Sequence, residues 1–399
     1  MSNIPKLRFP EFKGEWEEKK LSDIASFSKG KGYTKNDLVK NGTPIVLYGR
    51  MYTKYETVIS DIDTFVNLQE GSIISKGGEI IVPASGETAE EISRASVVKN
   101  KGIILGGDLN IISLQKDKYN PEFFALTISS GTSQKCLSKL AQGKSVVHLH
   151  NEDLSGLQIK APSLPEQQKI ADSLSNVDSI ITAETKILNT LQKKKKALMQ
   201  KLFTRHLRFK SDDGKDFPAW EEKKLGDVCE TYSGGTPKSG TAEYYGGEIP
   251  FIRSGEISSN KTELFLTEKG MENSSAKMVS KGDILYALYG ANSGLCSISK
   301  IDGAINQAIL CIKTNENKRF LCNYLQYQRE YFYSTYLQGG QGNLSGKLVE
   351  SFIIPLPCIA EQQKIADCLS SLDSLIQTQQ KVVTTWQQRK KALLQQMFI

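Results

Sequence analysis

The sequence predicts a mixed α/β fold in which two globular α+β domains are separated by two long antiparallel coiled-coil helices, arranged as a pseudo-two-fold internal repeat. Three observations predict this fold. Short motifs of the first half recur in the second half, each half ends in a long apolar heptad pattern, and acidic and basic residues gather at opposite ends of both heptad segments. The repetition is the most informative of the three, because it divides the chain into equivalent units.

The motifs that recur open and close each half. WEEKKL occupies Trp16–Leu21 and Trp220–Leu225, 204 positions apart, and EQQKIAD occupies Glu166–Asp172 and Glu361–Asp367, 195 positions apart. The tripeptide LRF precedes both halves, at positions 7 and 207. Between these motifs the halves share only scattered glycines, prolines and apolar runs. A duplicated enzyme is expected to keep its active-site residues, whereas this chain keeps the segments that flank its globular parts.

The repeat predicts four segments. They are a first globular domain at 1–160, a first helix at 161–204, a second globular domain at 205–355 and a second helix at 356–399. A chain of 399 residues is long enough for two domains that each bury a core of their own.

Each predicted helix follows a proline break, at Pro162 and Pro165 in the first copy and at Pro355 and Pro357 in the second. Proline is tolerated at a helix start because its missing N–H would be unpaired there, and the glutamate that follows suits the helix dipole. The segments 166–203 and 361–398 align without a gap, and 21 of their 38 positions are identical. A helix of that length spans about 57 Å.

Apolar residues in both segments follow a 4-3-4-3 spacing, which is the seam of a coiled coil. The predicted seam residues are Ile170, Leu174, Val177, Ile181, Leu188, Leu191, Leu198 and Leu202 in the first helix, and Ile365, Leu369, Leu372, Ile376, Val383, Trp386, Leu393 and Met397 in the second. A polar residue interrupts the seam at positions 184 and 195, and again at 379 and 390.

The charges of the helices predict the direction in which they pair. In both copies the acids lie in the N-terminal half and the lysines and arginines in the C-terminal half. An antiparallel pair puts each acidic end beside a basic end, whereas a parallel pair would put like charges together. We therefore expect an antiparallel pair with the globular domains at its opposite ends, related by an approximate two-fold axis. The run Lys193–Lys196 leaves three alternatives: a solvated helix end, contact with nucleic-acid phosphates, or contact with an acidic partner.

Both globular domains are expected to hold short strands and one helix before the closing strand. The predicted strands include 78–83, 102–105, 110–114, 249–253, 283–288 and 308–312, and the predicted helices are 121–129 and 318–333.

Composition limits the class of protein. The formal charge of +7 and the pI of about 8.8 permit a polyanionic partner without requiring one. The seven cysteines form no CxxC pair, which favours reduced thiols in a cytosol. The first residues hold no apolar run typical of a signal peptide, and no window is long and apolar enough for a membrane span. We therefore expect a cytoplasmic protein of a bacterium or archaeon, with no membrane partner.

The loops of both domains are rich in Gly, Ser, Thr, Tyr, Asn and Lys. Lys, Arg, Ser and Thr can hold DNA phosphates, and Arg, Asn, Gln and Tyr can reach base edges, although such loops are also ordinary turns. The candidate DNA-binding residues are Lys29, Lys31, Tyr33, Lys35, Tyr48, Arg50, Tyr52, Lys54 and Lys144 in the first domain, and Thr236, Lys238, Arg253, Ser254, Tyr289, Asn292, Gln341, Asn343 and Lys347 in the second.

No catalytic or metal-binding residues are predicted. The glycine and lysine at 143–144 and at 346–347 lack the first glycine of a P-loop. The chain has no Asn-Pro-Pro-aromatic motif of adenine methyltransferases and no nucleophile-elbow serine. His148 and His150 share one strand face without a third ligand, so an ordinary structural role is favoured over a metal site.

The motifs resemble those of the specificity subunits of type I restriction–modification enzymes. The residues that carry the resemblance are WEEKKL at Trp16–Leu21 and Trp220–Leu225, PEQQKIA at Pro165–Ala171 and AEQQKIA at Ala360–Ala366, where alanine replaces the usual proline. The resemblance covers the whole chain and identifies the globular domains as target recognition domains 1 and 2, and the helices as conserved spacer helices.

The resemblance also implies a function and partners. Each domain would read one part of a split, asymmetric double-stranded DNA target, and the helices would fix the unread gap. Two modification subunits, which methylate adenine, would dock on the helices, and motor–nuclease restriction subunits would join them in phage defence. The chain itself would be non-catalytic and hold no cofactor, because methyl donor, ATP and Mg²⁺ are expected on the partner subunits.

Three alternatives stay open at this point. The same kind of subunit could serve a modification-only or phage-exclusion system. From other classes, the chain could be a self-contained DNA endonuclease or methyltransferase, or a coiled-coil scaffold that does not meet DNA.

Overall fold

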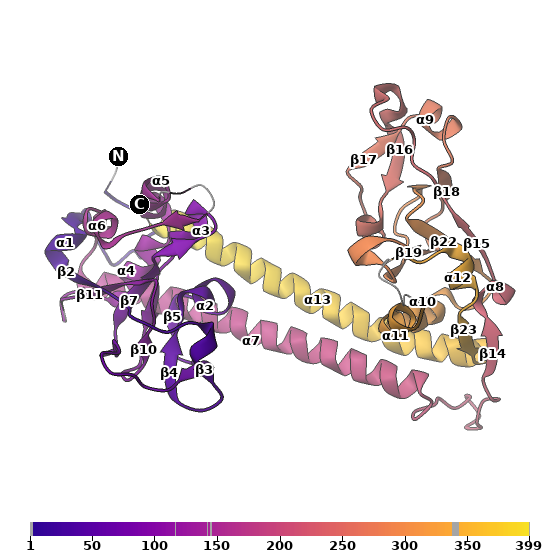
Figure 1. The fold of residues 1–399 in the computed structure, drawn as a ribbon, viewed down its shortest axis with the longest axis horizontal. Helices are drawn as coiled ribbons and strands as arrows, with labels where there is room; N and C mark the ends of the chain where they lie inside the picture. Colours follow the sequence, from indigo (N-terminus) through magenta and orange to yellow (C-terminus); the bar gives the residue numbers. More distant parts are fainter. Residues whose placement is uncertain (1–2, 116, 142, 144–145, 337–342, 399) are drawn as a thin grey trace. The chain divides into compact units, whose positions relative to one another are not determined.

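The computed structural model describes residues 3–115, 117–141, 143, 146–336 and 343–398 (Figure 1). Its contacts divide the chain into two compact units, Met1–Lys186 together with Lys381–Ile399, and Ile187–Gln380. Each unit contains one globular domain, the first part of the helix that follows this domain, and the C-terminal end of the other helix. Among the described residues, no helix has a stretch that is long and apolar enough to cross a bilayer.

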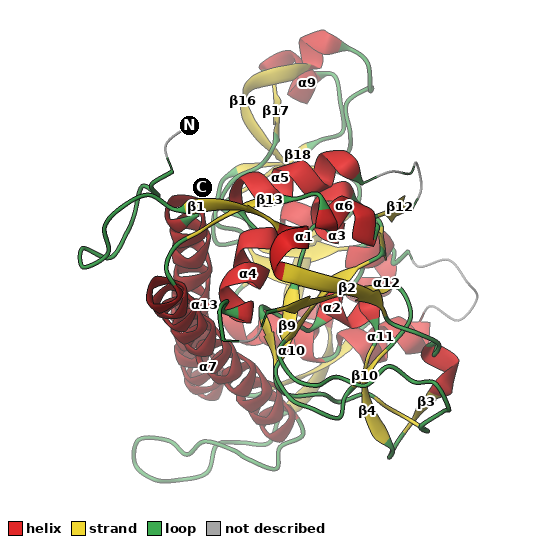
Figure 2. Ribbon diagram, turned by 90° about the vertical axis from the view of Figure 1, so that its left-hand side faces the viewer, coloured by secondary structure: helices red, strands yellow, loops and turns green. Residues whose placement is uncertain are grey.

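The described residues of the first domain form four sheets, with strand orders β2-β11-β7-β9-β5, β10-β4-β6-β3, β1-β13 and β12-β8. Its strands are β1 (Glu17–Lys20), β2 (Ala25–Lys29), β3 (Leu38–Val39), β4 (Thr43–Val46), β5 (Val58–Ile59), β6 (Phe65–Val66), β7 (Glu79–Pro83), β8 (Ser85–Gly86), β9 (Ser96–Val98), β10 (Ile104–Leu105), β11 (Leu109–Leu114), β12 (Val147–His148) and β13 (Gln158–Ala161). Its helices are α1 (Leu21–Ile24), α2 (Tyr48–Thr53), α3 (Ala89–Ile92), α4 (Pro121–Ile128), α5 (Gly131–Leu140) and α6 (Asn151–Ser155), and α7 (Leu164–Phe203) follows. Figure 2 shows β4 and β10 on the side of this domain away from α5 and α6.

The second domain repeats this plan, and the part of it that the structure describes forms the three sheets β15-β22-β19-β20, β17-β16-β21-β18 and β14-β23. Its strands are β14 (Glu221–Lys224), β15 (Cys229–Ser233), β16 (Tyr245–Ile252), β17 (Leu264–Leu266), β18 (Lys277–Val279), β19 (Ile284–Ala287), β20 (Cys296–Ile298), β21 (Gly303–Ile305), β22 (Ile309–Thr314) and β23 (Ile353–Leu356). Its helices are α8 (Leu225–Val228), α9 (Glu268–Glu272), α10 (Lys318–Tyr327), α11 (Arg329–Tyr336) and α12 (Gly346–Glu350), and α13 (Ile359–Met397) follows.

The core of each unit also contains the C-terminal end of the long helix that follows the other domain. Phe398, at the end of α13, packs against Phe123 of the first domain with ring centroids 5.6 Å apart. Phe203, at the end of α7, packs against Phe320 of the second domain at 5.8 Å. Each globular domain therefore buries apolar surface against both helices.

The long helices have the predicted seam. Of the sixteen predicted seam residues none is exposed, and eight are buried: Ile170, Leu174, Leu188, Leu202, Ile365, Leu369, Val383 and Met397. Two of the polar residues that interrupt the seam form ion pairs across it. Lys390 Nζ is 2.5 Å from Asp178 Oδ1 in the first unit, and Lys195 Nζ is 2.6 Å from Asp373 Oδ1 in the second. Each pair joins the acidic part of one helix to the basic part of the other, so the prediction of antiparallel pairing is confirmed.

The domains contain more helix than was predicted. The predicted helix at 121–129 is α4, but α5 follows it after a short break, and the helix predicted at 318–333 is divided at Gln328 into α10 and α11. The sequence of α5, GTSQKCLSKL, begins with glycine and buries only Ser133 and Leu137. Such a polar segment carries little periodic signal, because its stability comes from packing on the rest of the domain.

Candidate nucleic-acid interface and the joints that hold it

The repeated motifs form a joint between each domain and its helix. In the first unit the carboxylate of Glu166, only 1% exposed, accepts two hydrogen bonds from Arg8, Nε to Oε1 at 2.7 Å and an Nη to Oε2 at 2.8 Å. The buried indole N–H of Trp16 donates to the same carboxylate at 3.3 Å. A buried carboxylate is stable only when it is paired and hydrogen-bonded, and here three donors from two segments fix it.

The second unit repeats this joint. Glu361, with no exposed surface, accepts hydrogen bonds from Arg208 at 3.0 and 2.7 Å and from Trp220 Nε1 at 3.0 Å. The motif residues LRF, WEEKKL and EQQKIAD are therefore far apart in the sequence but meet at one place in each unit.

The glutamines of the motif bind the turn that leads out of the central sheet. The backbone N–H of Asn120 donates to Gln167 Oε1 at 3.0 Å, and its side-chain amide donates to Gln168 Oε1 at 2.7 Å. In the second unit, Asn317 makes the equivalent hydrogen bonds to Gln362 and Gln363, at 2.9 and 2.8 Å. The repeated residues thus hold the domain on the helix, which explains their recurrence without any catalytic role.

The candidate DNA-binding loops lie at the other end of the same sheets. In the first domain β11 begins at Leu109, far from the joint, and ends near the joint. At its beginning Asn110 pairs with Lys29, at the end of β2, and with Val82, near the end of β7. In the second domain Leu310, near the start of β22, pairs with Ser233 and Tyr286. The loops that follow these strands therefore gather at the sheet end opposite the joint.

Glycine allows these loops to lie close to neighbouring backbone. A Cβ atom on Gly30 would lie 1.8 Å from the carbonyl oxygen of Gly106, and one on Gly234 would lie 1.8 Å from that of Ile305. Any other residue would move the loop, so these positions require glycine.

Four candidates of the first domain are bound within the domain. An Nη of Arg50 is 2.5 Å from Asp63 Oδ1, and Lys54 Nζ is 2.8 Å from Asp63 Oδ2. The hydroxyl of Tyr52 donates to the carbonyl of Ser85 at 2.9 Å, and burial raises its pKa. Tyr33 has a positive φ of 62°, and its hydroxyl accepts a hydrogen bond from Gln69 N at 2.9 Å. These contacts fix the loops, so they leave less of each side chain available for DNA.

The remaining candidates of the first domain that the structure describes are exposed. Lys29, Lys31, Lys35 and Tyr48 carry no ion pair among the described residues, and Lys144 lies outside the described part of the chain. The three lysines give this loop cluster a positive charge of the kind that phosphates require.

In the second domain Arg253 is part of a salt-bridge cluster. It lies 3.1 Å from Glu256 and 2.5 Å from Glu263. Burial alone would raise the pKa of Glu256, but hydrogen bonds from Arg253, the backbone N–H of Glu263 and Thr262 lower it to about 2. Arg253 thus stabilises its own loop, as does Thr236, whose hydroxyl donates to Gln307 at 2.6 Å.

The other candidates of the second domain are Lys238, Ser254, Tyr289, Asn292, Asn343 and Lys347, and Gln341 lies outside the described residues. Lys238, Tyr289, Asn343 and Lys347 are exposed, whereas Ser254 and Asn292 are half-buried. The backbone N–H of Leu344 donates to the carbonyl of Leu288 at 2.8 Å, which brings the segment that contains Asn343 and Lys347 beside Tyr289. The structure therefore brings together two separate segments, one with Tyr289 and Asn292 and one with Asn343 and Lys347.

His148 and His150 lie at the loop end of the first domain, although neither was among the candidates. Both are exposed, and their rings stack with centroids 6.4 Å apart. The neighbouring Asn151 donates to the carbonyl of Ser28 at 3.0 Å, which connects them to the Lys29 loop. Among the described residues no group of three or more His, Cys, Asp or Glu side chains is placed to hold a metal ion. The His-x-His spacing, which puts both rings on one face of an extended segment, is the sequence pattern that could have identified them as neighbours.

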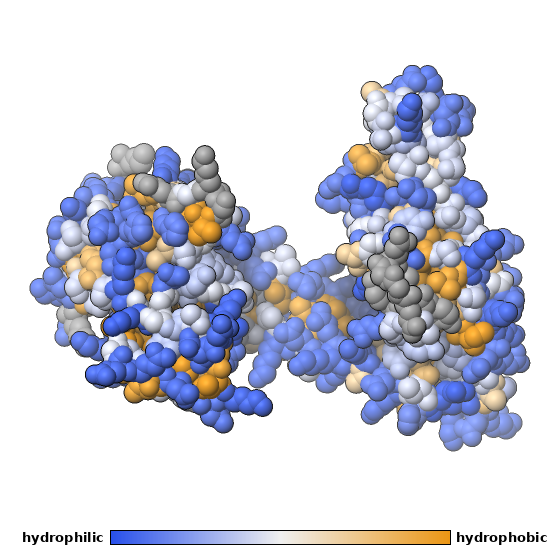
Figure 3. Space-filling view, in the orientation of Figure 1, coloured by the Kyte–Doolittle hydropathy of each residue, from blue (hydrophilic) through white to orange (hydrophobic). Residues whose placement is uncertain are grey.

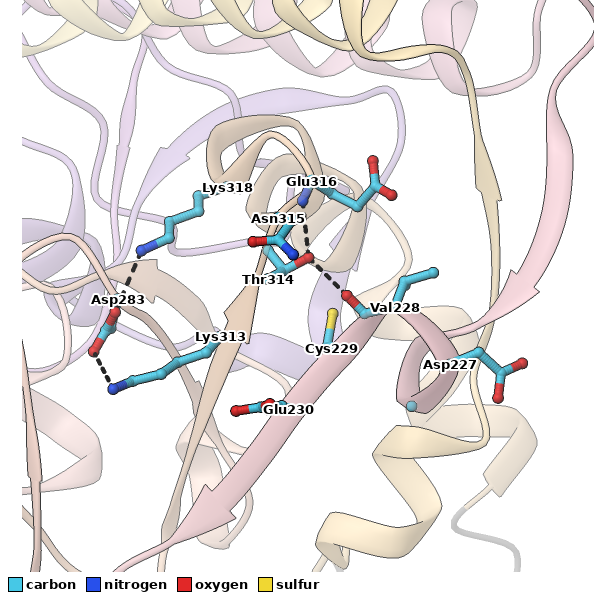
Figure 4. A pocket seen from close by; sticks show the side chains of 11 residues that line it. Asp227, Val228, Cys229, Glu230, Asp283, Lys313, Thr314, Asn315, Glu316 and Lys318 are labelled. Carbon is cyan, nitrogen blue, oxygen red and sulfur yellow. Dashed lines mark hydrogen bonds and ion pairs between the residues drawn. The ribbon is translucent and has the colours of Figure 1, made fainter.

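Each domain also has a cavity at the joint end of its central sheet, with a volume of about 680 Å³ in the second domain and about 720 Å³ in the first. In the second (Figure 4), Lys318 is 3.3 Å and Lys313 is 3.9 Å from the buried Asp283. Burial raises the pKa of the nearby Cys229, so it stays a neutral thiol, which is a poor nucleophile. Asp283, Lys313 and Lys318 of this cavity are paired with one another rather than directed at a ligand.

The comparisons with known proteins agree with this geometry. The sequence profile of the family described as "Type I restriction modification DNA specificity domain" matches residues 13–193 and 219–385. The chain is 27% identical to the putative type I restriction enzyme MjaX specificity subunit of Methanocaldococcus jannaschii over 98% of its length and 95% of that protein, and 26% identical to the MjaVIII specificity subunit of the same organism over 97% and 92%. The structure is similar to the S subunit of a type I restriction-modification system from M. genitalium, with a TM-score of 0.65, 17% identity and 99% of both chains covered.

Proposed function

The chain belongs to the family of type I restriction modification DNA specificity domains, of which it carries two copies, and we propose that it is the specificity subunit of a type I restriction–modification system. Each domain reads one half of a split, asymmetric DNA target. One observation carries this proposal: both units hold the same joint, while the loops at the opposite sheet ends differ in sequence. Because the joints are equivalent and the loops differ, the two domains suit a target whose two half-sites differ in sequence.

The long helices set the distance between the half-sites. Two reading domains that meet the same face of B-DNA must be separated by about 34–36 Å or a multiple of it. Helices of 40 and 39 residues are long enough for this, at 1.5 Å per residue. The chain is therefore both the reader of the target and the spacer of its two parts.

We place two modification subunits on these helices, one at each unit, with motor–nuclease restriction subunits added to that complex. An apolar flank on each unit supports this arrangement. In the second unit Ile187 is 48% and Leu375 is 54% exposed, although both lie on helices that are otherwise polar on their outer side. Figure 3 shows such hydrophobic residues among charged ones on the helix surface. The equivalents in the first unit, Val382 and Ile180, are half-exposed.

These apolar flanks face away from the globular domains. Asp178 lines a small cavity against the first domain together with Thr57, and Asp373 lines a groove against the second domain. Ile180 and Leu375 each lie two residues further along, which is about 200° around an α-helix. Because the two flanks are equivalent under the repeat, they suit two copies of the same partner.

We infer that the chain itself is non-catalytic and acts in the cytoplasm of a bacterium or archaeon. Methyl donor, ATP and Mg²⁺ belong to the partner subunits in this proposal. Incubation of the purified chain alone with DNA, Mg²⁺ and methyl donor is then expected to give neither cleavage nor methylation, and robust turnover would contradict it.

The test of the reading function is an exchange of the first domain. Residues 20–160 are replaced with the corresponding domain of another specificity subunit, and the target is determined by mapping methylated adenines in cells that carry the complex. One half of the recognised sequence should change and the other half should stay the same. A change in both halves, or in neither, would show that the domains do not read DNA independently.

A further inference from the structure

A groove of about 610 Å³ lies in the second unit, between the globular domain and the helices. The domain contributes Lys281 from the turn between β18 and β19, Lys300 from the turn between β20 and β21, and Arg319 from the first turn of α10. The helices contribute Lys195 from α7, and Asp373 with its neighbours from α13. Figure 1 shows α10 beside α13 in this unit.

The groove has an excess of positive charge. Its described lining holds four cations, Lys195, Lys281, Lys300 and Arg319, and one carboxylate, Asp373. Lys195 already neutralises Asp373 at 2.6 Å. The other three side chains are exposed, and none of them carries an ion pair among the described residues. Arg319 donates one hydrogen bond to Ser370 Oγ at 3.3 Å, which connects the first turn of α10 to α13.

The polar groups between these cations are short hydroxyls and amides. Ser258, Ser297, Ser370 and Ser374 line the groove together with Asn323 and Gln377. Lys, Arg, Ser, Asn and Gln are the donors that proteins use for phosphate oxygens of DNA, and such contacts carry no sequence information directly. The chemistry of the groove therefore suits a chain of phosphates rather than a single base edge.

The cavity beside the equivalent lysine of the first unit has a different charge. The repeat supplies the equivalent ion pair there, between Lys390 and Asp178. The cavity that contains Lys390 is lined by three carboxylates, Glu56, Glu90 and Glu91, and by one other cation, Arg94. The helices are thus equivalent in the two units, and the residues that differ come from the globular domains. The excess of positive charge in the groove is therefore not repeated in the cavity beside Lys390.

The place of the groove along α13 indicates which DNA it meets. The joint uses residues 361–363 at the start of α13, whereas the groove contains Ser370, Asp373 and Gln377, further along the helix. DNA that is read by the second domain and continues toward the other half-site must run along the helices that set the gap. We propose that this groove binds phosphates of the unread gap next to the second half-site, independently of sequence. This inference rests on the proposed function, because it assumes a split target.

An acidic segment of a partner protein is the alternative occupant. The donor set favours DNA, because hydroxyls and amides line the groove together with cations, and proteins use all of these donors for phosphate oxygens. A protein carboxylate would be better matched by an arginine free to bind it in a bidentate manner, and Arg319 already gives one donor to Ser370.

The test uses the full chain assembled with its modification subunits. Binding is measured by fluorescence anisotropy over a range of salt concentrations, with a duplex that carries the mapped target and with a random duplex of equal length. Lys281→Ala combined with Lys300→Ala should weaken binding to both duplexes by about tenfold at ~0.15 M salt and make the slope of log K against log salt less steep by about 2. Lys201→Ala combined with Lys224→Ala removes two exposed lysines of the same unit outside the groove and should change neither value.

Hydroxyl-radical footprinting locates the contact. The groove variant should lose protection of the backbone in the gap beside the second half-site, while the half-sites stay protected and unchanged in sequence. Unchanged affinity and salt slope would overturn the inference, and so would a loss of assembly with the modification subunits at unchanged DNA affinity, which would indicate the acidic protein segment. If the complex without substitutions shows no preference for the target duplex, the proposed function fails. If that preference is present and the groove variant equals the control, only the groove inference fails.

Discussion

The guanidinium of Arg208 lies 2.7 Å from Oε2 of Glu361, whose side chain has no exposed surface. The same pair occurs in the other unit between Arg8 and Glu166. In both units a segment before the domain reaches the helix after the domain, 153 and 158 positions later in the sequence. This contact fixes the beginning and the end of each domain on one helix turn.

Arg208→Ala should lower the free energy of unfolding of the second unit by about 2–3 kcal/mol, because it leaves the buried carboxylate of Glu361 with one indole donor. Urea unfolding followed by tryptophan fluorescence measures the loss. Lys210→Ala is the matched control, because Lys210 Nζ is 3.8 Å from Asp216 and both side chains are exposed. The control should cost less than about 0.5 kcal/mol. Equal losses in the two variants would contradict a structural role of the joint.

Glu256 makes the stability of the second unit depend on acid pH. Its pKa of about 2 in the folded protein is lower than in an unfolded chain. The stabilisation is therefore fully present above the unfolded pKa of about 4.3 and is lost as the pH falls toward about 2. Glu256→Gln should lower the free energy of unfolding by about 1–2 kcal/mol at neutral pH, since solvent screens part of the interaction, and flatten its pH dependence in that window.

Glu263→Gln is the control for that measurement. Glu263 also contacts Arg253, but its side chain is 80% exposed. Its replacement should cost less than about 1 kcal/mol and leave the pH dependence intact. If both variants respond alike, the low pKa of Glu256 has no part in stability.

Two leucines lie on different faces of α13, Leu369 on the seam and Leu375 on the outer flank. Leu369 has no exposed surface and Leu375 is 54% exposed, six residues later on the same helix. Leu369→Ala should destabilise the protein by about 3–5 kcal/mol through the lost burial and the cavity left behind. Leu375→Ala should change the free energy of unfolding by less than about 0.5 kcal/mol but weaken binding of the modification subunit in calorimetry. Normal binding of that subunit by Leu375→Ala would remove the flank from the docking surface.

The exposed lysines of the first domain should act on DNA through phosphates. Lys29→Ala is expected to weaken binding of the mapped target about fivefold at ~0.15 M salt and to make the salt slope less steep by about 1. Lys13→Ala removes an equally exposed lysine from the segment between the LRF and WEEKKL motifs, beside the joint, and should have no effect. Anisotropy titration of both variants decides whether the loop end is the DNA-binding end.

The sequence was sufficient for the helices and insufficient for the loops. The seam and the end-to-end charge difference predicted the antiparallel pair, because both signals repeat every few residues. The partners of Arg50 and Arg253 depend on how loops fold back, and no periodic pattern reports that. Glu166 was recognised as part of a repeated motif, but its contacts with Arg8 and Trp16 join residues at least 150 positions apart. The repeated motif was therefore sufficient to indicate the family, whereas its role in holding the domain on the helix required the structure.

The exchange of helix ends between the units has a consequence for biosynthesis. The second unit is one continuous stretch, Ile187–Gln380, whereas the first needs Lys381–Ile399, which includes Phe398 packed against Phe123. At roughly 5–20 residues per second, the ribosome adds those last residues some 10–40 seconds after finishing the first domain. We therefore expect the first domain to complete its core after the second has been made, and a nascent chain to expose that unfinished surface to chaperones until residues 381–398 have been synthesised.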